Sequence, residues 1–105
     1  LVGELLPRWA VRMGVQPTSV RLRTVKTRWG SCNVATGAIM LSRKLALVPP
    51  ALVEAVLVHE LCHLRHPDHS PAFHRDLTFF LPDDKERKHQ LDTFVFDALP
   101  PKGGR

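Results

Sequence analysis

Residues 51–64, with the sequence ALVEAVLVHELCHL, form the one long and strongly apolar helical stretch of this 105-residue chain. Apolar residues recur in it at spacings of three and four, which is typical of a helix that packs against a core. Pro49 and Pro50 stand just before it, where a first helical turn tolerates proline, and Pro67 follows its end. We therefore predict a helix over about residues 51–64 that stops before Pro67.

This helix ends in an HExxH pattern, His59-Glu60-Leu61-Cys62-His63. Two histidines four residues apart lie on one face of a helix, so both imidazoles can bind one Zn²⁺ ion. Glu60 is then placed to act as general base on a water molecule that the zinc activates. Burying these polar groups without partners would cost on the order of several kcal/mol, which disfavours ordinary core histidines. The pattern therefore predicts a zinc hydrolase.

A catalytic zinc ion normally takes three protein ligands and keeps one position for water. The candidates for the third ligand are, in order of preference, His69, His74 and His66, with the carboxylate of Asp76 as an outside choice. His69 comes first because the break at Pro67 lets the chain turn back toward the metal. His66 comes last of the histidines, because three ligands on one straight helix strain a tetrahedral geometry.

The remaining pattern predicts a small sheet and further helices. Residues 19–28 alternate between apolar and polar and read as a half-buried strand, and residues 38–41 read as a second strand. We expect these two strands to pair antiparallel through the loop around Gly37. Helices are predicted over residues 1–14, with a start as late as Pro7, over 71–81 and over 82–99. Ser70 is the predicted N-cap of the second of these helices.

Length and composition indicate one soluble folded domain. The chain is 44% hydrophobic and 24% charged, and its length supports one modest core. We expect this domain to span residues 1–99, followed by a disordered tail over 100–105. Because the chain begins with Leu1 rather than Met, we expect it to be a piece of a longer protein. Cys32 and Cys62 form no disulfide framework, and no apolar run is long enough to span a bilayer, so we expect a cytoplasmic protein without membrane partners.

The charge of the chain is unevenly distributed. Residues 1–48 carry eight Lys and Arg against the single acid Glu4, whereas residues 49–105 carry seven against nine acids. A basic first half favours an anionic partner, either nucleic acid or a phosphate-bearing ligand. A solvated surface that keeps the protein soluble explains the same surplus equally well.

Several segments together resemble the YgjP-like metallopeptidase family and the related SprT-like zincins. These segments are residues 28–32 (RWGSC), 38–42 (AIMLS), 59–64 (HELCHL) and 69–73 (HSPAF). The resemblance implies an α+β, zincin-like fold, in which a short antiparallel sheet packs on the active-site helix and further helices follow. It also implies a Zn²⁺ ion held by His59, His63 and His69, with Glu60 as general acid and base. We therefore expect a zinc-dependent metallopeptidase that hydrolyses peptide or protein substrates.

Two other functions remain open from the sequence. The same zinc chemistry and the basic first half suit a phosphohydrolase that acts on nucleotides or phosphoesters. A nucleic-acid-associated module with a structural zinc is the other alternative, and it would need a fourth ligand such as His66 or His74. For a peptidase, the strand over residues 38–42 is expected to lie at the sheet edge and to hold an extended peptide by β-augmentation.

Overall fold

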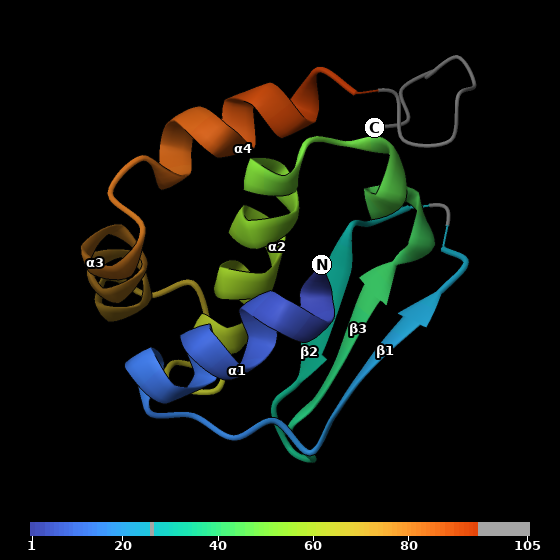
Figure 1. Ribbon diagram of the computed structural model, residues 1–105. Coiled ribbons are helices and arrows are strands. Elements are labelled where there is room, and N and C mark those ends of the chain that lie inside the picture. Colours follow the sequence, from blue (N-terminus) through green and yellow to red (C-terminus); the bar gives the residue numbers. More distant parts are fainter. Residues whose placement is uncertain (26, 95–105) are drawn as a thin grey trace.

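The computed structural model describes residues 1–25 and 27–94. These residues form a sheet on one side of the molecule and a set of helices on the other (Figure 1). The elements in chain order are α1 (Val2–Met13), β1 (Ser19–Arg23), β2 (Gly30–Asn33), β3 (Ala38–Ser42), the 3₁₀ helix η1 (Arg43–Leu47), α2 (Pro50–Cys62), α3 (Pro71–Phe80) and α4 (Asp84–Asp92). The predicted α+β class is confirmed.

Helix α2 lies at the centre of the molecule, between the sheet and the other helices (Figure 1). Nine of its thirteen residues are buried, and Leu57, Val58 and Leu61 are fully enclosed. A helix that is apolar on all sides needs neighbours on all sides, which explains why its apolar run predicts a central position. The helix ends at Cys62, and His63 and Leu64, which we predicted to be helical, form the turn that follows it.

The sheet is mixed, and its strand order is β1-β3-β2. β1 pairs parallel with β3, so the predicted antiparallel pairing of residues 19–28 with residues 38–41 is wrong. The antiparallel partner of β3 is β2, joined to it by a turn in which Gly37 has a φ of 80° and its N–H donates to the Asn33 carbonyl. The sequence GSCN of β2 has too little apolar alternation to mark a strand, so the sequence does not indicate it as the hairpin partner of β3.

β2 is therefore the edge strand nearest to α2, and β3 is the central strand. The expectation that residues 38–42 form the edge is wrong, because β3 is paired on both sides. Gly30 allows β2 to lie close to the helix: a Cβ atom there would lie 3.1 Å from both the Met40 carbonyl oxygen and Val56 Cγ1. The absent side chain thus brings the edge of the sheet against the helix that carries HExxH.

The remaining helices match the predictions at some ends and differ at others. Ser70 caps α3 as predicted, and its Oγ accepts a hydrogen bond from the Phe73 N–H at 3.3 Å. α1 begins at Val2, well before Pro7, and α4 ends at Asp92 rather than at residue 99. The predictions for residues 95–99 and for the tail over 100–105 lie outside the described residues.

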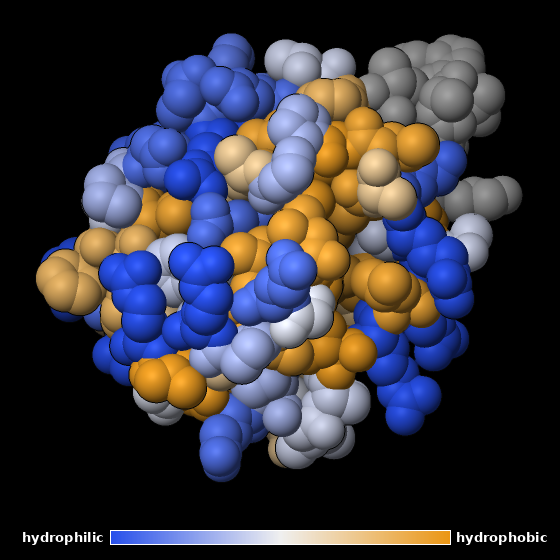
Figure 2. Space-filling view, in the orientation of Figure 1, coloured by the Kyte–Doolittle hydropathy of each residue, from blue (hydrophilic) through white to orange (hydrophobic). Residues whose placement is uncertain are grey.

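The face of the molecule in Figure 2 has apolar residues at its centre and hydrophilic residues on both sides. The large exposed apolar side chains of the described residues come from separate elements. They are Leu1, Val11, Leu22, Val34, Leu47 and Phe79. Among the described residues, no helix combines the length and the apolarity that crossing a membrane requires.

A partly buried carboxylate connects three helices. Glu54 of α2 accepts hydrogen bonds from Trp9 Nε1 of α1 at 2.7 Å and from Arg87 Nη1 of α4 at 2.9 Å. Burial raises the pKa of Glu54, but the hydrogen bonds from Arg87 and Trp9 outweigh it, so the pKa lies below its usual value of 4.5. This carboxylate therefore stabilises the folded state when it is ionised.

We expect Glu54→Gln to destabilise the protein by about 1–3 kcal/mol at pH 7, because the amide leaves one donor without an acceptor and removes the charge. A carboxyl with a lowered pKa contributes stability above its unfolded pKa and loses it as the pH falls through its folded pKa. The difference between wild type and variant should thus shrink below pH 4.5. Urea denaturation at pH 7 and at acid pH measures this, with the exposed Glu86→Gln as control. An unchanged difference at acid pH would contradict the assigned role of the charge.

Candidate metal centre

Three histidine side chains converge where α2 ends. His59 and His63 lie one turn apart on α2 and at its C-terminal boundary, and His69 comes from the loop that leads into α3. One ring nitrogen from each lies within 4.8 Å of the others, and the Nε2 atoms of His59 and His69 are 3.3 Å apart. The turn after α2 and the break at Pro67 bring His69 back to the helix, as the sequence predicted.

The geometry and chemistry of this cluster fit a zinc ion. Zn–N bonds of 2.0–2.1 Å in a tetrahedral site place two ligand nitrogens about 3.3 Å apart. The Nε2 atoms of His59 and His69 already have this separation. Within residues 1–25 and 27–94, no fourth His, Cys, Asp or Glu joins the group. A catalytic zinc ion takes three protein ligands and keeps its fourth coordination position for water, whereas a structural zinc ion takes four protein ligands. Three imidazoles match the catalytic set.

The protonation states of the cluster suit metal binding. Burial, followed by the nearby rings of His63 and His69, lowers the pKa of His59 to about 4. Burial also lowers the pKa of His63 below its usual value. An imidazole binds a metal only when it is neutral, so at neutral pH both His59 and His63 offer a nitrogen lone pair.

The ring of Phe73 forms the apolar floor of the cluster. It is fully buried, and its centroid lies 5.1 Å from the ring of His59, 4.6 Å from His63 and 4.9 Å from His69. Phe73 is held in turn from α2, because the Cys62 thiol donates to the Phe73 carbonyl at 3.7 Å. The predicted packing role of Cys62 agrees with its complete burial.

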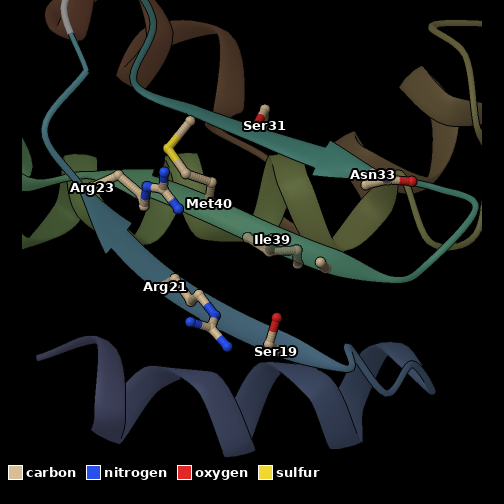
Figure 3. A pocket seen from close by; sticks show the side chains of 8 residues that line it. Ser19, Arg21, Arg23, Ser31, Asn33, Ile39 and Met40 are labelled. Atoms are coloured by element: carbon tan, nitrogen blue, oxygen red, sulfur yellow. The ribbon is translucent and has the colours of Figure 1, made fainter.

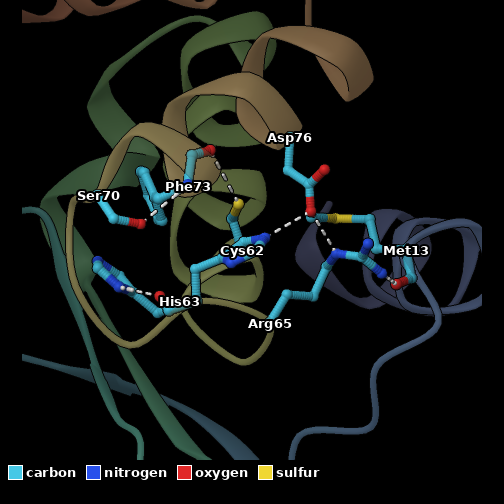
Figure 4. Close-up of polar contacts among 8 residues, drawn as sticks. Met13, Cys62, His63, Arg65, Ser70, Phe73 and Asp76 are labelled. Carbon is cyan, nitrogen blue, oxygen red and sulfur yellow. Dashed lines mark hydrogen bonds and ion pairs between the residues drawn. The ribbon is translucent and has the colours of Figure 1, made fainter.

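A network of polar contacts fixes the turn that orients His63 (Figure 4). The Nδ1 atom of His63 lies 3.3 Å from the His66 carbonyl oxygen. A proton on Nδ1 is held by this carbonyl, so the lone pair is on Nε2. The turn is held by Asp76 of α3, which accepts from Arg65 Nε and from His66 Nε2, both at 2.7 Å. Arg65 also donates to the Met13 carbonyl of α1 at 2.8 Å.

The other predicted ligand candidates lie outside the cluster of three. The side chains of His66 and Asp76 are paired with each other. The ring of His74 stacks on His69 at a centroid distance of 6.1 Å, beyond the group of converging nitrogens. These positions leave His69 as the residue that the structure brings to His59 and His63.

We expect Asp76→Asn to weaken zinc binding by up to about tenfold, at the low end of the range for groups that orient metal ligands. The variant removes the charge that holds Arg65 and His66, so the His66 carbonyl no longer fixes the His63 ring. Competition with a chromophoric chelator measures the affinity. Asp92→Asn, which changes a surface carboxylate on α4, is the matched control. Equal affinities of Asp76→Asn and wild type would show that the network does not orient His63.

Glu60 lies beside the histidines and faces the edge strand. Its side chain is 7% exposed, and burial raises its pKa to about 7, opposed by the charge of Arg28. Burial, and after it the charge of Glu60, raises the pKa of the Cys32 thiol on β2. Because α2 packs against β2, this influence places the Glu60 carboxyl near Cys32 at that contact.

Three features of the site were not identified from the sequence. Phe73 and residues 30–32 lie in segments that resemble the family, but the sequence predicts neither the ring contacts of Phe73 nor the edge position of β2. The carbonyl of His66 carries no sequence signal at all, because every residue has a backbone carbonyl. A strand was, however, signalled indirectly by the RWGSC segment, since it precedes a turn and a second apolar run.

The fold has counterparts among known proteins. A search of the curated proteins finds no match. The fold is similar to the crystal structure of the metallopeptidase zymogen abylysin of Pyrococcus abyssi, with a TM-score of 0.79 and 26% identity, covering 89% of this chain and 93% of that chain. It is also similar to the metallopeptidase zymogen jannalysin of Methanocaldococcus jannaschii, with a TM-score of 0.75 and 13% identity, covering 87% and 93%, which shows the fold alone.

The family model described as the YgjP-like metallopeptidase domain matches residues 1–94. This span contains all three histidines of the cluster, Glu60 and the edge strand β2. The chain belongs to the YgjP-like family of metallopeptidase domains and is a metallohydrolase.

Proposed function

We propose that this protein is a zinc-dependent metallopeptidase in which His59, His63 and His69 hold the metal and Glu60 is the general base. The convergence of three imidazole nitrogens within 4.8 Å, beside a buried carboxyl, is the observation that carries the proposal. A bound zinc ion would supply a Lewis acid for the water and for the substrate carbonyl. The chain's own residues then provide the proton transfers and the binding of the substrate.

Glu60 is the group that moves the proton. Its carboxylate takes a proton from the attacking water as the oxygen–carbon bond forms, and it delivers that proton to the amine as the carbon–nitrogen bond breaks. Its place one residue after His59 fixes it to the same helix as two ligands, so its distance from the metal varies little. Phe73 beneath the rings keeps the ligands in position.

β2 is the strand that binds the substrate backbone. One edge of β2 pairs with β3, and its other edge pairs with no strand of the described residues. An extended peptide that adds to this edge gains backbone hydrogen bonds and lies across the face of α2 that carries Glu60. The peptide bond to be hydrolysed is thereby brought beside both the general base and the histidine cluster.

We expect the zinc-loaded protein to hydrolyse unstructured peptides and to leave nucleoside triphosphates and phosphodiesters intact. The physical reason is the open edge of β2, which recognises a peptide backbone and offers nothing comparable to a phosphoester. Assays of both substrate classes with one preparation, read by mass spectrometry, make the comparison. Hydrolysis of phosphoesters without peptide cleavage would instead favour the phosphohydrolase.

A further inference from the structure

A pocket lies on the outer face of the sheet (Figure 3). It has a volume of about 220 Å³, and all three strands contribute to it. Its lining residues are Ser19, Arg21, Arg23, Ser31, Asn33, Ala38, Ile39 and Met40. Side chains alternate between the faces of a strand, and the buried Ile39 and Leu41 side chains point toward α2. The neighbouring Met40 therefore points to the opposite face, so the pocket and the histidine cluster lie on different sides of the sheet.

The polar groups around this outer-face pocket are mostly hydrogen-bond donors. Arg21 and Arg23 stand two residues apart on the same face of β1, about 6.6 Å along the strand. The side-chain oxygen of Asn33 accepts from the N–H groups of Ala35 and Thr36, at 3.0 and 3.2 Å, which directs its NH₂ group outward as a donor. The hydroxyls of Ser19 and Ser31 complete the set.

The pocket also lacks negative charge. None of its lining residues is Asp or Glu, and the ion pairs found among the described residues involve neither Arg21 nor Arg23. An anion between the two guanidinium groups would interact favourably with both of them. This local arrangement accounts for part of the surplus of Lys and Arg in residues 1–48.

We propose that the outer-face pocket binds the phosphate group of a small organic phosphate. The planar guanidinium groups of Arg21 and Arg23 match phosphate oxygens in pairs, and the Asn33 amide and the serine hydroxyls donate to the remaining oxygens. The Met40 side chain supplies an apolar surface for the organic part of the ligand. A volume of about 220 Å³ accommodates such a compact molecule, whereas a nucleic acid needs a long basic track.

Calorimetric titration of the zinc-loaded protein with phenyl phosphate and with inorganic phosphate tests this proposal. We expect both to bind and phenyl phosphate to bind more tightly. The double variant Arg21→Gln/Arg23→Gln should weaken both by at least about tenfold, since it removes the charge-assisted hydrogen bonds. Arg43→Gln, an exposed arginine of η1, is the matched control and should bind as wild type does. Met40→Ala should weaken phenyl phosphate more than inorganic phosphate.

Two further readouts separate this pocket from the metal centre. NMR shift changes on adding phenyl phosphate should centre on residues 19–23 and 38–40, and changes confined to residues 59–69 would overturn the proposal. The double variant should retain peptidase activity, which shows that it is folded. Equal affinities of the double variant and wild type would also overturn it. Tighter binding of an oligonucleotide than of phenyl phosphate would also overturn the proposal, if its affinity falls with salt as steeply as contacts to several phosphates require. That result indicates a nucleic-acid surface.

Discussion

Replacement of Glu60 by Gln is expected to lower peptide hydrolysis by about a thousandfold while zinc remains bound. General-base catalysis contributes roughly 10²–10⁴-fold to such reactions, and an amide cannot take up the proton of the attacking water. The metal ligands are untouched by the change, so kcat should fall with little change in the zinc content. Peptidase assays and metal analysis of the same purified variant provide the two measurements.

Because Glu60 is buried, Glu60→Gln is expected to remove the carboxylate without destabilising the fold. Glu60 is 7% exposed, and burial disfavours its charged carboxylate. The folded state therefore tolerates a neutral amide of the same shape at least as well as it tolerates the carboxylate. A loss of activity is therefore not caused by unfolding, and thermal denaturation of both proteins checks this. Glu86→Gln on the exposed face of α4 is the control that should retain full activity. Activity of Glu60→Gln within about tenfold of wild type would exclude the general-base role.

Replacement of His69 by Ala should weaken zinc binding by about a hundredfold and abolish hydrolysis. Zinc binding to sites with four ligands amounts to about 10–16 kcal/mol, or about 3 kcal/mol per ligand, and 1.4 kcal/mol corresponds to a factor of ten. His69 lies in the loop before α3 rather than inside a packed element, so its removal should perturb the affinity more than the fold. Isothermal titration with zinc measures the loss.

His74→Ala is the matched control for this experiment. The His74 ring stacks on His69 at 6.1 Å but lies outside the cluster of converging nitrogens, so zinc affinity should change little. His66→Ala should resemble Asp76→Asn, because both disturb the same paired side chains. If His74→Ala instead weakened binding as much as His69→Ala does, the assignment of the third ligand would be wrong.

Much of the fold could be predicted from local pattern. The central helix, the cap at Ser70 and the α+β class follow from periodicity and from the placement of proline and serine, all of which act within a few residues. The start of α1 could not be placed, because Pro7 is compatible with a helix start before or at it. The pairing of β1 was predicted wrongly, since an apolar alternation marks a strand without naming its neighbour.

The same division holds at the candidate site. The spacing of His59, Glu60 and His63 is fixed by the covalent geometry of one helix, so the sequence by itself determined the relative positions of two histidines of the cluster and of the Glu60 carboxyl. It also made His69 the preferred third position, because Pro67 predicts a break in the chain between His63 and His69. Only the tertiary structure decided that β2 is the edge strand nearest to α2, that Phe73 lies under the rings and that Asp76 holds the turn at His66. These contacts join segments far apart along the chain, and their free energy depends on burial and packing that no local spacing encodes.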